Sequence, residues 1–151
     1  MAGLAPRPGD HAVDVYCGAG GISLALARAG AETLGIETHA GAVADATASA
    51  ALDGATTARF VAGDAARALH AVPRADLVVL NPPRKGCAEA VLAEVVRLGP
   101  RAVAYLSCDA DTLARDLAWL APRGYRAREV TPFDMLPHTP HVEALALIAP
   151  V

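Results

Sequence analysis

The strongest constraint on the fold is a regular alternation of short strand-like runs with longer helical ones. Starting at residue 11, a strand–helix unit occurs five times. The fourth run, 75–81 (ADLVVLN), is nearly all apolar, as expected for a central strand covered on both faces. The last two runs, 125–135 and 141–150, have only the loop 136–140 between them. We therefore predict an α/β fold with a doubly wound, mostly parallel Rossmann-like sheet that ends in an antiparallel β-hairpin.

The boundaries of these units follow from glycine stops and apolar periodicity. The predicted strands of the five units are 11–16, 32–37, 58–64, 75–81 and 101–108. The predicted helices are 22–30, 39–54, 65–72, 85–100 and 109–124. A chain of 151 residues with 54% hydrophobic and only 4% aromatic residues suits one domain, 1–151, with a core of Ala, Val and Leu.

Composition narrows the classes of function. The formal net charge of −3 argues against a grip on nucleic acid by bulk electrostatics alone. The three cysteines have scattered spacings without a CxxC pair, so we predict no metal site and a reduced, cytoplasmic setting. His138 and His141 have no matching third ligand and are interpreted as loop residues. We predict no membrane span and see no signal peptide.

Polar and small residues gather where the predicted strands end. In doubly wound sheets, ligands bind at the carboxyl ends of the strands, near the switch in strand order. Five candidate residues fall at those ends: Gly18, Glu37, Asp64, Asn81 and Cys108. This agreement predicts a site at that edge but does not name a reaction.

The first strand leads into a glycine-rich turn, VDVYCGAGG, which predicts a nucleoside cofactor. Glu37, at the end of the next strand, suits the hydroxyls of a ribose. A nicotinamide dinucleotide would favour G-x-G-x-x-G, but Ser23 stands at the third glycine position. S-adenosylmethionine (SAM) sites commonly use an acid followed by G-x-G, and Asp14 supplies that acid. SAM is the preferred interpretation, and a nicotinamide oxidoreductase is the alternative.

The fourth strand is followed by Asn81-Pro82-Pro83-Arg84. Two prolines stiffen the turn and remove two backbone donors, which exposes the Asn81 side chain to a ligand. Methyltransferases that act on amino or amide nitrogens carry an aromatic residue after this motif. Arg84 stands there, so nitrogen methylation is the weaker alternative. Arg84 and Lys85 offer cations for a phosphate or a base edge.

Cys108 follows the fifth strand and precedes the cap-like Asp109. A helix N-terminus favours the reactive thiolate, whereas Asp109 and Asp111 oppose it. A thiolate that adds to carbon 6 of a uracil makes carbon 5 nucleophilic enough to accept a methyl group, and a base must then remove the C5 proton. Glu143, at the start of the last strand, is the candidate base.

Together these motifs resemble the catalytic domain of the SAM-dependent RNA uracil-5-methyltransferases, which modify a uridine in transfer RNA or 23S ribosomal RNA. The resemblance runs from about Pro8 to Ile148 and is carried, in order, by DVYCGAGGISLALA, GIE, NPPRKG, YLSCDADTLARDL and FDMLPHTPHVEALAL. It implies that Cys108 is the nucleophile and Glu143 the base. It also implies a SAM site formed by Tyr16, Gly18, Gly20, Gly21, Glu37, Asp64 near the adenine, and Asn81 near the methionine end and the target base.

The departures from the family pattern shape the remaining expectations. The chain starts close to the first glycine motif, so we expect the upstream RNA-binding part to be absent, or to be supplied by a partner. The Asn-Pro-Pro-Arg form resembles a branch that modifies 23S rRNA. Asp109 stands where Asn is usual, and its charge would raise the thiol pKa. A domain that binds SAM without turnover is a further alternative.

Overall fold

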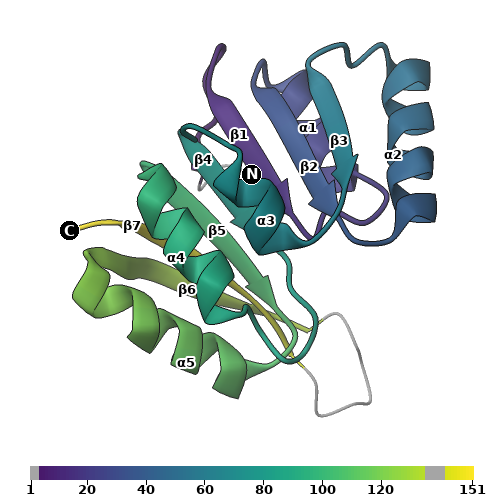
Figure 1. Ribbon diagram of the computed structural model, residues 1–151. Helices are drawn as coiled ribbons and strands as arrows, with labels where there is room; N and C mark the ends of the chain where they lie inside the picture. Colours follow the sequence, from purple (N-terminus) through teal and green to yellow (C-terminus); the bar gives the residue numbers. More distant parts are fainter. Residues whose placement is uncertain (1–3, 135–141) are drawn as a thin grey trace.

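The computed structural model describes residues 4–134 and 142–151 and has a seven-stranded sheet in the order β3-β2-β1-β4-β5-β7-β6 (Figure 1). The strands are β1 (His11–Val15), β2 (Glu32–Glu37), β3 (Ala58–Ala62), β4 (Leu77–Leu80), β5 (Ala102–Ser107), β6 (Tyr125–Phe133) and β7 (Glu143–Pro150). The helices are α1 (Gly21–Arg28), α2 (Ala40–Asp53), α3 (Ala65–His70), α4 (Glu89–Leu98) and α5 (Ala110–Leu120), which continues into the 3-10 turn η2 (Ala121–Arg123).

The strand pairing confirms the doubly wound sheet. Strands β1 to β5 run parallel to one another, and the chain runs outward from β1 to β3 before crossing back to β4. The switch in strand order therefore lies between β1 and β4. Strand β7 is antiparallel to both β5 and β6, so the predicted hairpin is confirmed and is inserted against the parallel strands.

The apolar run of the fourth strand is explained by burial on both faces. Val78 and Leu80 pack into the larger core cluster with residues of α3, α4 and α5. Leu77 and Val79 point the other way and pack with Leu26 of α1. Because successive strand residues alternate in direction, a strand covered on both faces buries every side chain, which explains the continuous apolar run of β4.

The predicted start of the fourth helix was wrong. The fourth helix begins at Glu89, whereas the sequence pattern predicted a start at residue 85. Gly86 has a positive φ of 73°, and its amide donates to the Pro83 carbonyl at 2.8 Å, so residues 83–86 form a closed turn. The helix start of the fifth unit is confirmed, because Asp109 caps α5 by accepting from the Thr112 amide at 2.9 Å.

Two further findings concern membrane spans and metal sites. In residues 4–134 and 142–151, no helix is both long and apolar enough to cross a membrane. The same part of the chain contains no group of three or more side chains suited to hold a metal ion. His138 and His141 lie outside the described residues.

Candidate active site

The carboxyl ends of the first four strands meet at one edge of the sheet, where backbone hydrogen bonds continue past the strands. The Cys17 amide donates to the Ile36 carbonyl at 3.0 Å, which joins the ends of β1 and β2. The Asn81 amide donates to the Val15 carbonyl at 3.2 Å, which joins β4 to β1 across the switch point. Four of the predicted ligand-end residues therefore follow strands that end side by side: Gly18, Glu37, Asp64 and Asn81.

Glu37 is bonded to the glycine loop. Its Oε2 accepts from the Gly18 amide at 3.1 Å, and its Oε1 accepts from the His39 amide and the Thr38 hydroxyl, both at 3.0 Å. Burial raises the pKa of this half-buried carboxyl, but these hydrogen bonds more than offset burial, so the pKa is lowered. The residue is therefore a charged acceptor at neutral pH, as a ribose site requires.

The loop that connects β1 to α1 has an unusual backbone. Tyr16 is a non-glycine residue with a φ of 64°, in the left-handed region that side chains with a Cβ rarely adopt. Gly18 and Gly20 follow with φ values of 53° and 84°. A Cβ at Gly18 or Gly21 would meet no atom within 4 Å, so the outer side of this loop is open to a ligand. Strain of this kind is typical of functional loops.

Asp14 and Ser23 form a contact that sequence reasoning missed. The Ser23 hydroxyl donates to Asp14 Oδ2 at 2.6 Å, and both side chains are buried. Burial raises the pKa of Asp14 to about 6, against the lowering effect of the Ser23 bonds. In the sequence, Ser23 marks only a departure from the dinucleotide-binding pattern. In the structure, its hydrogen bond to Asp14 joins α1 to β1 beneath the glycine loop. A buried serine nine residues after a buried acid carries no strong local signal.

Cys108 is half-buried at the end of β5. Its neighbours on either side are held in place, because the Asp109 amide donates to Ser107 Oγ at 3.1 Å and Ser107 Oγ donates to the Asp109 carbonyl at 2.8 Å. The pKa of Asp109 is lowered by hydrogen bonds from Thr112. The Asp109 carboxylate, which the sequence places beside the thiol, therefore accepts a hydrogen bond from the first turn of its own helix.

The other two cysteines have thiols that stay protonated. Burial raises the pKa of Cys17 to about 12, with the carboxylates of Asp14 and Glu37 adding to the effect. Burial likewise raises the pKa of Cys87 to about 12. Neither thiol is suited to act as a nucleophile.

Glu143 and Cys108 each lie at the end of the strand pairing between β5 and β7. These strands pair in antiparallel fashion, and their last pair at this end is Ser107 opposite Ala144. Cys108 directly follows Ser107, and Glu143, the first residue of β7, directly precedes Ala144. Glu143 itself pairs with Phe133 of β6. The pairing therefore brings the strand ends that carry the thiol and the carboxylate to the same end of the sheet.

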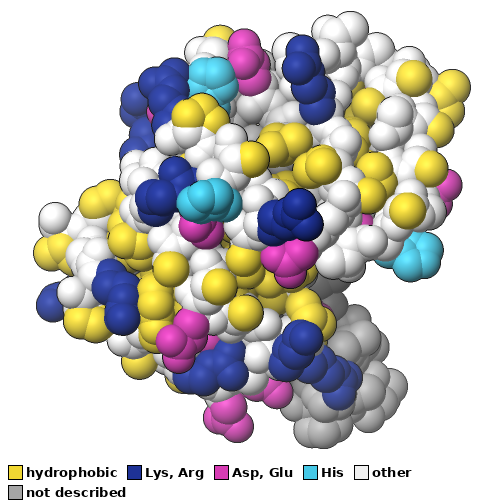
Figure 2. Space-filling view, in the orientation of Figure 1, with side chains coloured by type: hydrophobic (Ala, Val, Ile, Leu, Met, Phe, Trp, Pro, Cys, Tyr) yellow, Lys and Arg dark blue, Asp and Glu magenta, His cyan; other side chains and the backbone are white. Residues whose placement is uncertain are grey.

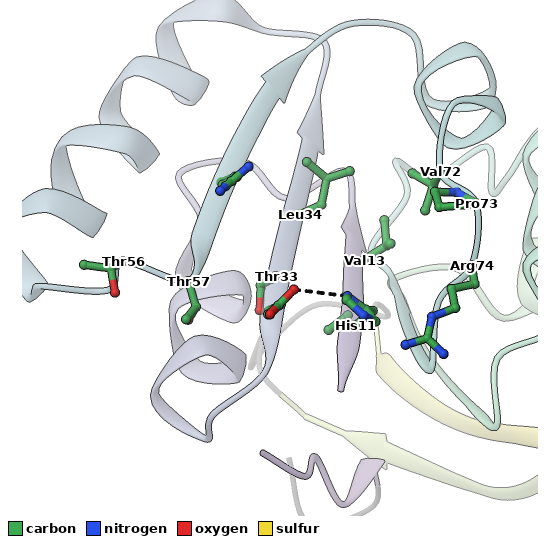
Figure 3. A pocket seen from close by; sticks show the side chains of 12 residues that line it. His11, Val13, Thr33, Leu34, Thr56, Thr57, Val72, Pro73 and Arg74 are labelled. Atoms are coloured by element: carbon green, nitrogen blue, oxygen red, sulfur yellow. Dashed lines mark ion pairs between the residues drawn. The ribbon is translucent and has the colours of Figure 1, made fainter. Parts of the chain in front are cut away.

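A separate hollow of about 490 Å³ opens at the other edge of the sheet, at the amino ends of β1 to β3 (Figure 3). The apolar side chains of Val13 and Leu34 line the hollow, and so do the cationic side chains of Arg59 and Arg74. His11 and Glu32 form an ion pair across it at 3.3 Å. None of the predicted site residues lines this hollow, and its mixed charges select no ligand class. Figure 2 likewise shows Lys and Arg side chains dispersed over this face of the molecule.

A parallel sheet with a switch point, a glycine loop and a carboxylate, closed by an inserted antiparallel strand, is the fold of the SAM-dependent methyltransferases. This chain belongs to the tRNA (uracil-5-)-methyltransferase family, whose pattern matches residues 5–150. It is 49% identical to a protein of Geobacter sulfurreducens described as an uncharacterized RNA methyltransferase, with 92% of this chain and 29% of the relative covered. The chain thus spans about a third of the length of the curated relatives it matches.

Solved structures agree with this assignment. The tRNA (uracil-54, C5)-methyltransferase of Pyrococcus abyssi, in complex with S-adenosyl-L-homocysteine, superposes with a TM-score of 0.86 at 29% identity. The match covers 97% of this chain and 36% of that one. A precorrin-6y C5,15-methyltransferase of Geobacter metallireducens has a TM-score of 0.80 at 14% identity, with 99% and 84% covered, which reflects the shared fold alone.

Proposed function

We propose that residues 1–151 form a SAM-dependent catalytic domain that methylates carbon 5 of a uridine in RNA. Family membership and the open glycine loop support the class of reaction. The observation that carries the proposal is the pairing of Ser107 with Ala144, because Cys108 and Glu143 are the next residues beyond this last pair of β5 and β7. A nucleophile and a base on opposite sides of one pyrimidine are what this reaction requires.

The loop geometry fits SAM. In this proposal the Glu37 carboxylate accepts hydrogen bonds from the ribose hydroxyls, and the loop containing Tyr16, Gly18, Gly20 and Gly21 lies along the cofactor. Asp64 lies near the adenine, and Asn81 lies near the methionine end and the target base. The P. abyssi relative was solved with S-adenosyl-L-homocysteine, the product form of this cofactor. When bound, SAM supplies the methyl group.

The chain's own residues account for the remaining steps. The Cys108 thiolate forms a bond to carbon 6 of the uracil, which turns the ring into an enolate with a nucleophilic carbon 5. After carbon 5 has accepted the methyl group, the Glu143 carboxylate removes the C5 proton. The electron pair of the C5–H bond then re-forms the C5–C6 double bond, and the Cys108 sulfur leaves as a thiolate. The target uracil must be flipped out of the RNA to reach this edge of the sheet.

The substrate is proposed to be ribosomal RNA in the cytoplasm. The Asn81-Pro82-Pro83-Arg84 turn favours the 23S rRNA branch over tRNA. Arg84 and Lys85 are exposed at this turn and suit RNA phosphates. With a net charge of −3, most of the affinity for RNA is expected to come from another part of a longer protein or from a partner.

A trapping assay tests the proposal. The protein is mixed with SAM and a 23S rRNA fragment that contains 5-fluorouridine, and a denaturant-stable adduct is sought by intact mass. Fluorine cannot leave carbon 5 as a proton, so the bond to Cys108 should persist. We expect one adduct per chain, lost in Cys108→Ala and kept in Cys87→Ala. A tRNA fragment run in parallel tests the choice of RNA.

The alternatives predict different outcomes. Methyl transfer that survives in Cys108→Ser would favour an amino or amide target at the Asn-Pro-Pro turn. SAM binding without an adduct on either RNA would favour a domain without turnover and would contradict the proposal for this chain. Glu143→Gln should still form the adduct on normal uridine but release product more slowly, because the C5 proton has lost its acceptor.

A further inference from the structure

The turn that carries Asn81, residues 81–87 (the Asn-Pro-Pro turn), is bonded through its second half to α5, the helix that follows Cys108. The Thr112 hydroxyl donates to the Arg84 carbonyl at 3.0 Å. Arg115 Nη2 donates to the Lys85 carbonyl at 3.0 Å and to the Cys87 carbonyl at 3.3 Å. The carbonyls that accept these bonds lie in no helix or strand. Side chains of α5 therefore supply the hydrogen-bond donors that a helix or sheet would otherwise provide to this turn.

Asp116 completes this attachment from inside the protein. Its side chain is buried, and its Oδ2 accepts from the Cys87 amide at 2.8 Å and from the Tyr105 hydroxyl at 2.5 Å. Its Oδ1 accepts from Arg115 Nη2 at 2.7 Å. A carboxylate withdrawn from water is stabilised only when its oxygens are occupied in this way, so each of these bonds restrains its partner.

The fit between the turn and the helix leaves no spare room. A Cβ placed on Gly86 would lie 2.6 Å from Arg115 Nη2 and 2.8 Å from Asp116 Oδ2. The glycine loop reaches the same region, because Tyr16 packs against the core cluster that contains Cys87 and Tyr105. Three segments of the candidate site therefore share one buried cluster: the glycine loop, the Asn-Pro-Pro turn and the helix behind Cys108.

We propose that Arg115 and Asp116 are positioning residues that hold the Asn-Pro-Pro turn in register with the helix behind Cys108. This inference rests on the proposed function. In the proposed reaction, Asn81 and Cys108 approach the same uracil from two different segments, and the bonds of Arg115 and Asp116 join the turn directly to the helix behind Cys108. A displacement of about 1 Å between reacting groups can slow a reaction about 100-fold, so the attachment controls the rate without touching the substrate.

The test uses Arg115→Ala, since the Arg115 side chain is 55% exposed and its removal takes away the bonds to the Lys85 and Cys87 carbonyls. The matched control is Arg123→Ala, which removes an arginine that stacks on Trp119 and donates to its carbonyl. Adduct formation with 5-fluorouridine RNA is timed at saturating SAM and RNA. We expect Arg115→Ala to be slower by a factor on the order of 10 or more, and Arg123→Ala to match the wild type.

Two readouts separate positioning from general damage. The dissociation constant for SAM and the RNA concentration at half-maximal rate should stay within about twofold of the wild type, because the turn is misplaced but both ligands still bind. Arg115→Lys should recover part of the rate, since one ammonium can still donate to a turn carbonyl. An adduct rate in Arg115→Ala equal to the wild type would overturn the inference, as would a loss of SAM affinity of the same size.

The two proposals fail in different ways. A wild-type chain that forms no adduct refutes the proposed function, whereas a wild-type adduct with an unchanged Arg115→Ala rate refutes the positioning role alone. If circular dichroism shows that Arg115→Ala is unfolded, Thr112→Val serves instead. That variant removes the bond to the Arg84 carbonyl and keeps the side-chain volume, and the same slower adduct formation is expected, to a smaller degree.

Discussion

The environment shifts the pKa values of two carboxyls at the candidate site in opposite directions. Burial raises the pKa of Glu37, but hydrogen bonds, mainly from the backbone, more than offset burial and lower it. Burial raises the pKa of Asp14 to about 6, and its Oδ1 has no partner among the described residues. The two carboxyls bracket the glycine loop, with the charged one toward the ligand side and the buried one beneath.

Asp14→Asn should change how stability depends on pH. The folded pKa is about 6 against 3.8 for an ordinary Asp, so the folded state binds the proton more tightly. This contribution is fully present below pH ~4 and is lost as the pH rises through ~6. The amide never ionises, so the variant should gain on the order of 3 kcal/mol relative to the wild type between pH 4 and pH 7, measured by urea unfolding.

The control for this prediction is Asp45→Asn, which changes an exposed carboxylate of α2. Its stability difference from the wild type should be nearly constant over the same range. Parallel profiles for wild type and Asp14→Asn would contradict the burial argument. Comparison with the wild type at each pH removes the opposite slope that the lowered pKa of Glu37 contributes.

At the scale of elements, the glycine loop packs closely against the two neighbouring strands, β2 and β3. A Cβ on Gly35 of β2 would lie 2.5 Å from Phe60 Cδ1 and 2.9 Å from Cys17 Sγ. A Cβ on Gly20 would lie 2.8 Å from Phe60 Cε1. Phe60, on the edge strand β3, therefore fills the space that both glycines leave. Sequence patterns predicted the strand but not this contact, because it joins three elements.

Gly35→Ala should therefore destabilise the protein by about 1–3 kcal/mol, since the methyl group has no room between Phe60 and Cys17. Thermal and urea unfolding would measure this. Gly63→Ala is the control, because a Cβ there meets nothing within 4 Å. In a double-mutant cycle, Phe60→Leu should relieve part of the cost of Gly35→Ala. Strictly additive effects would show that Phe60 is not the obstacle.

Over the whole molecule, positive side chains are not concentrated in one large patch on the face that Figure 2 shows. The net charge is −3, and Figure 2 shows cations dispersed over the helical face that it presents. Arg84 and Lys85 lie beside the candidate site, whereas Arg59 and Arg74 line the hollow at the opposite edge of the sheet. Binding of RNA at the site should therefore depend on a few local cations, not on the overall field.

The double variant Arg84→Ala/Lys85→Ala should weaken binding of a single-stranded RNA and lower the slope of log affinity against log salt by about 1.4, because two phosphate contacts are lost. Titrations between 50 and 200 mM salt would measure it. Arg59→Ala/Arg74→Ala makes the same change in net charge at the opposite edge and should leave the slope unchanged. Equal losses in both double variants would show that RNA is bound by the general field.

The sequence by itself determined the order of the elements, the parallel sheet with its terminal hairpin, and the residues at the strand ends. These features follow from local patterns: apolar runs, glycine stops and caps are properties of neighbouring residues. The late start of α4 was missed because the turn bonds of residues 83–86, together with contacts from α5, prevail over helical periodicity.

Only the tertiary structure decided which distant residues meet. Strand β7 is inserted beside β5 in one particular register, which brings Cys108 and Glu143 to the same end of the sheet, and a shift of one residue would turn Glu143 to the other face. The bonds of Arg115 and Asp116 to the Asn-Pro-Pro turn, and of Ser23 to Asp14, likewise depend on how helices pack on the sheet. Contacts of this kind join residues far apart in the chain, so no local pattern encodes them.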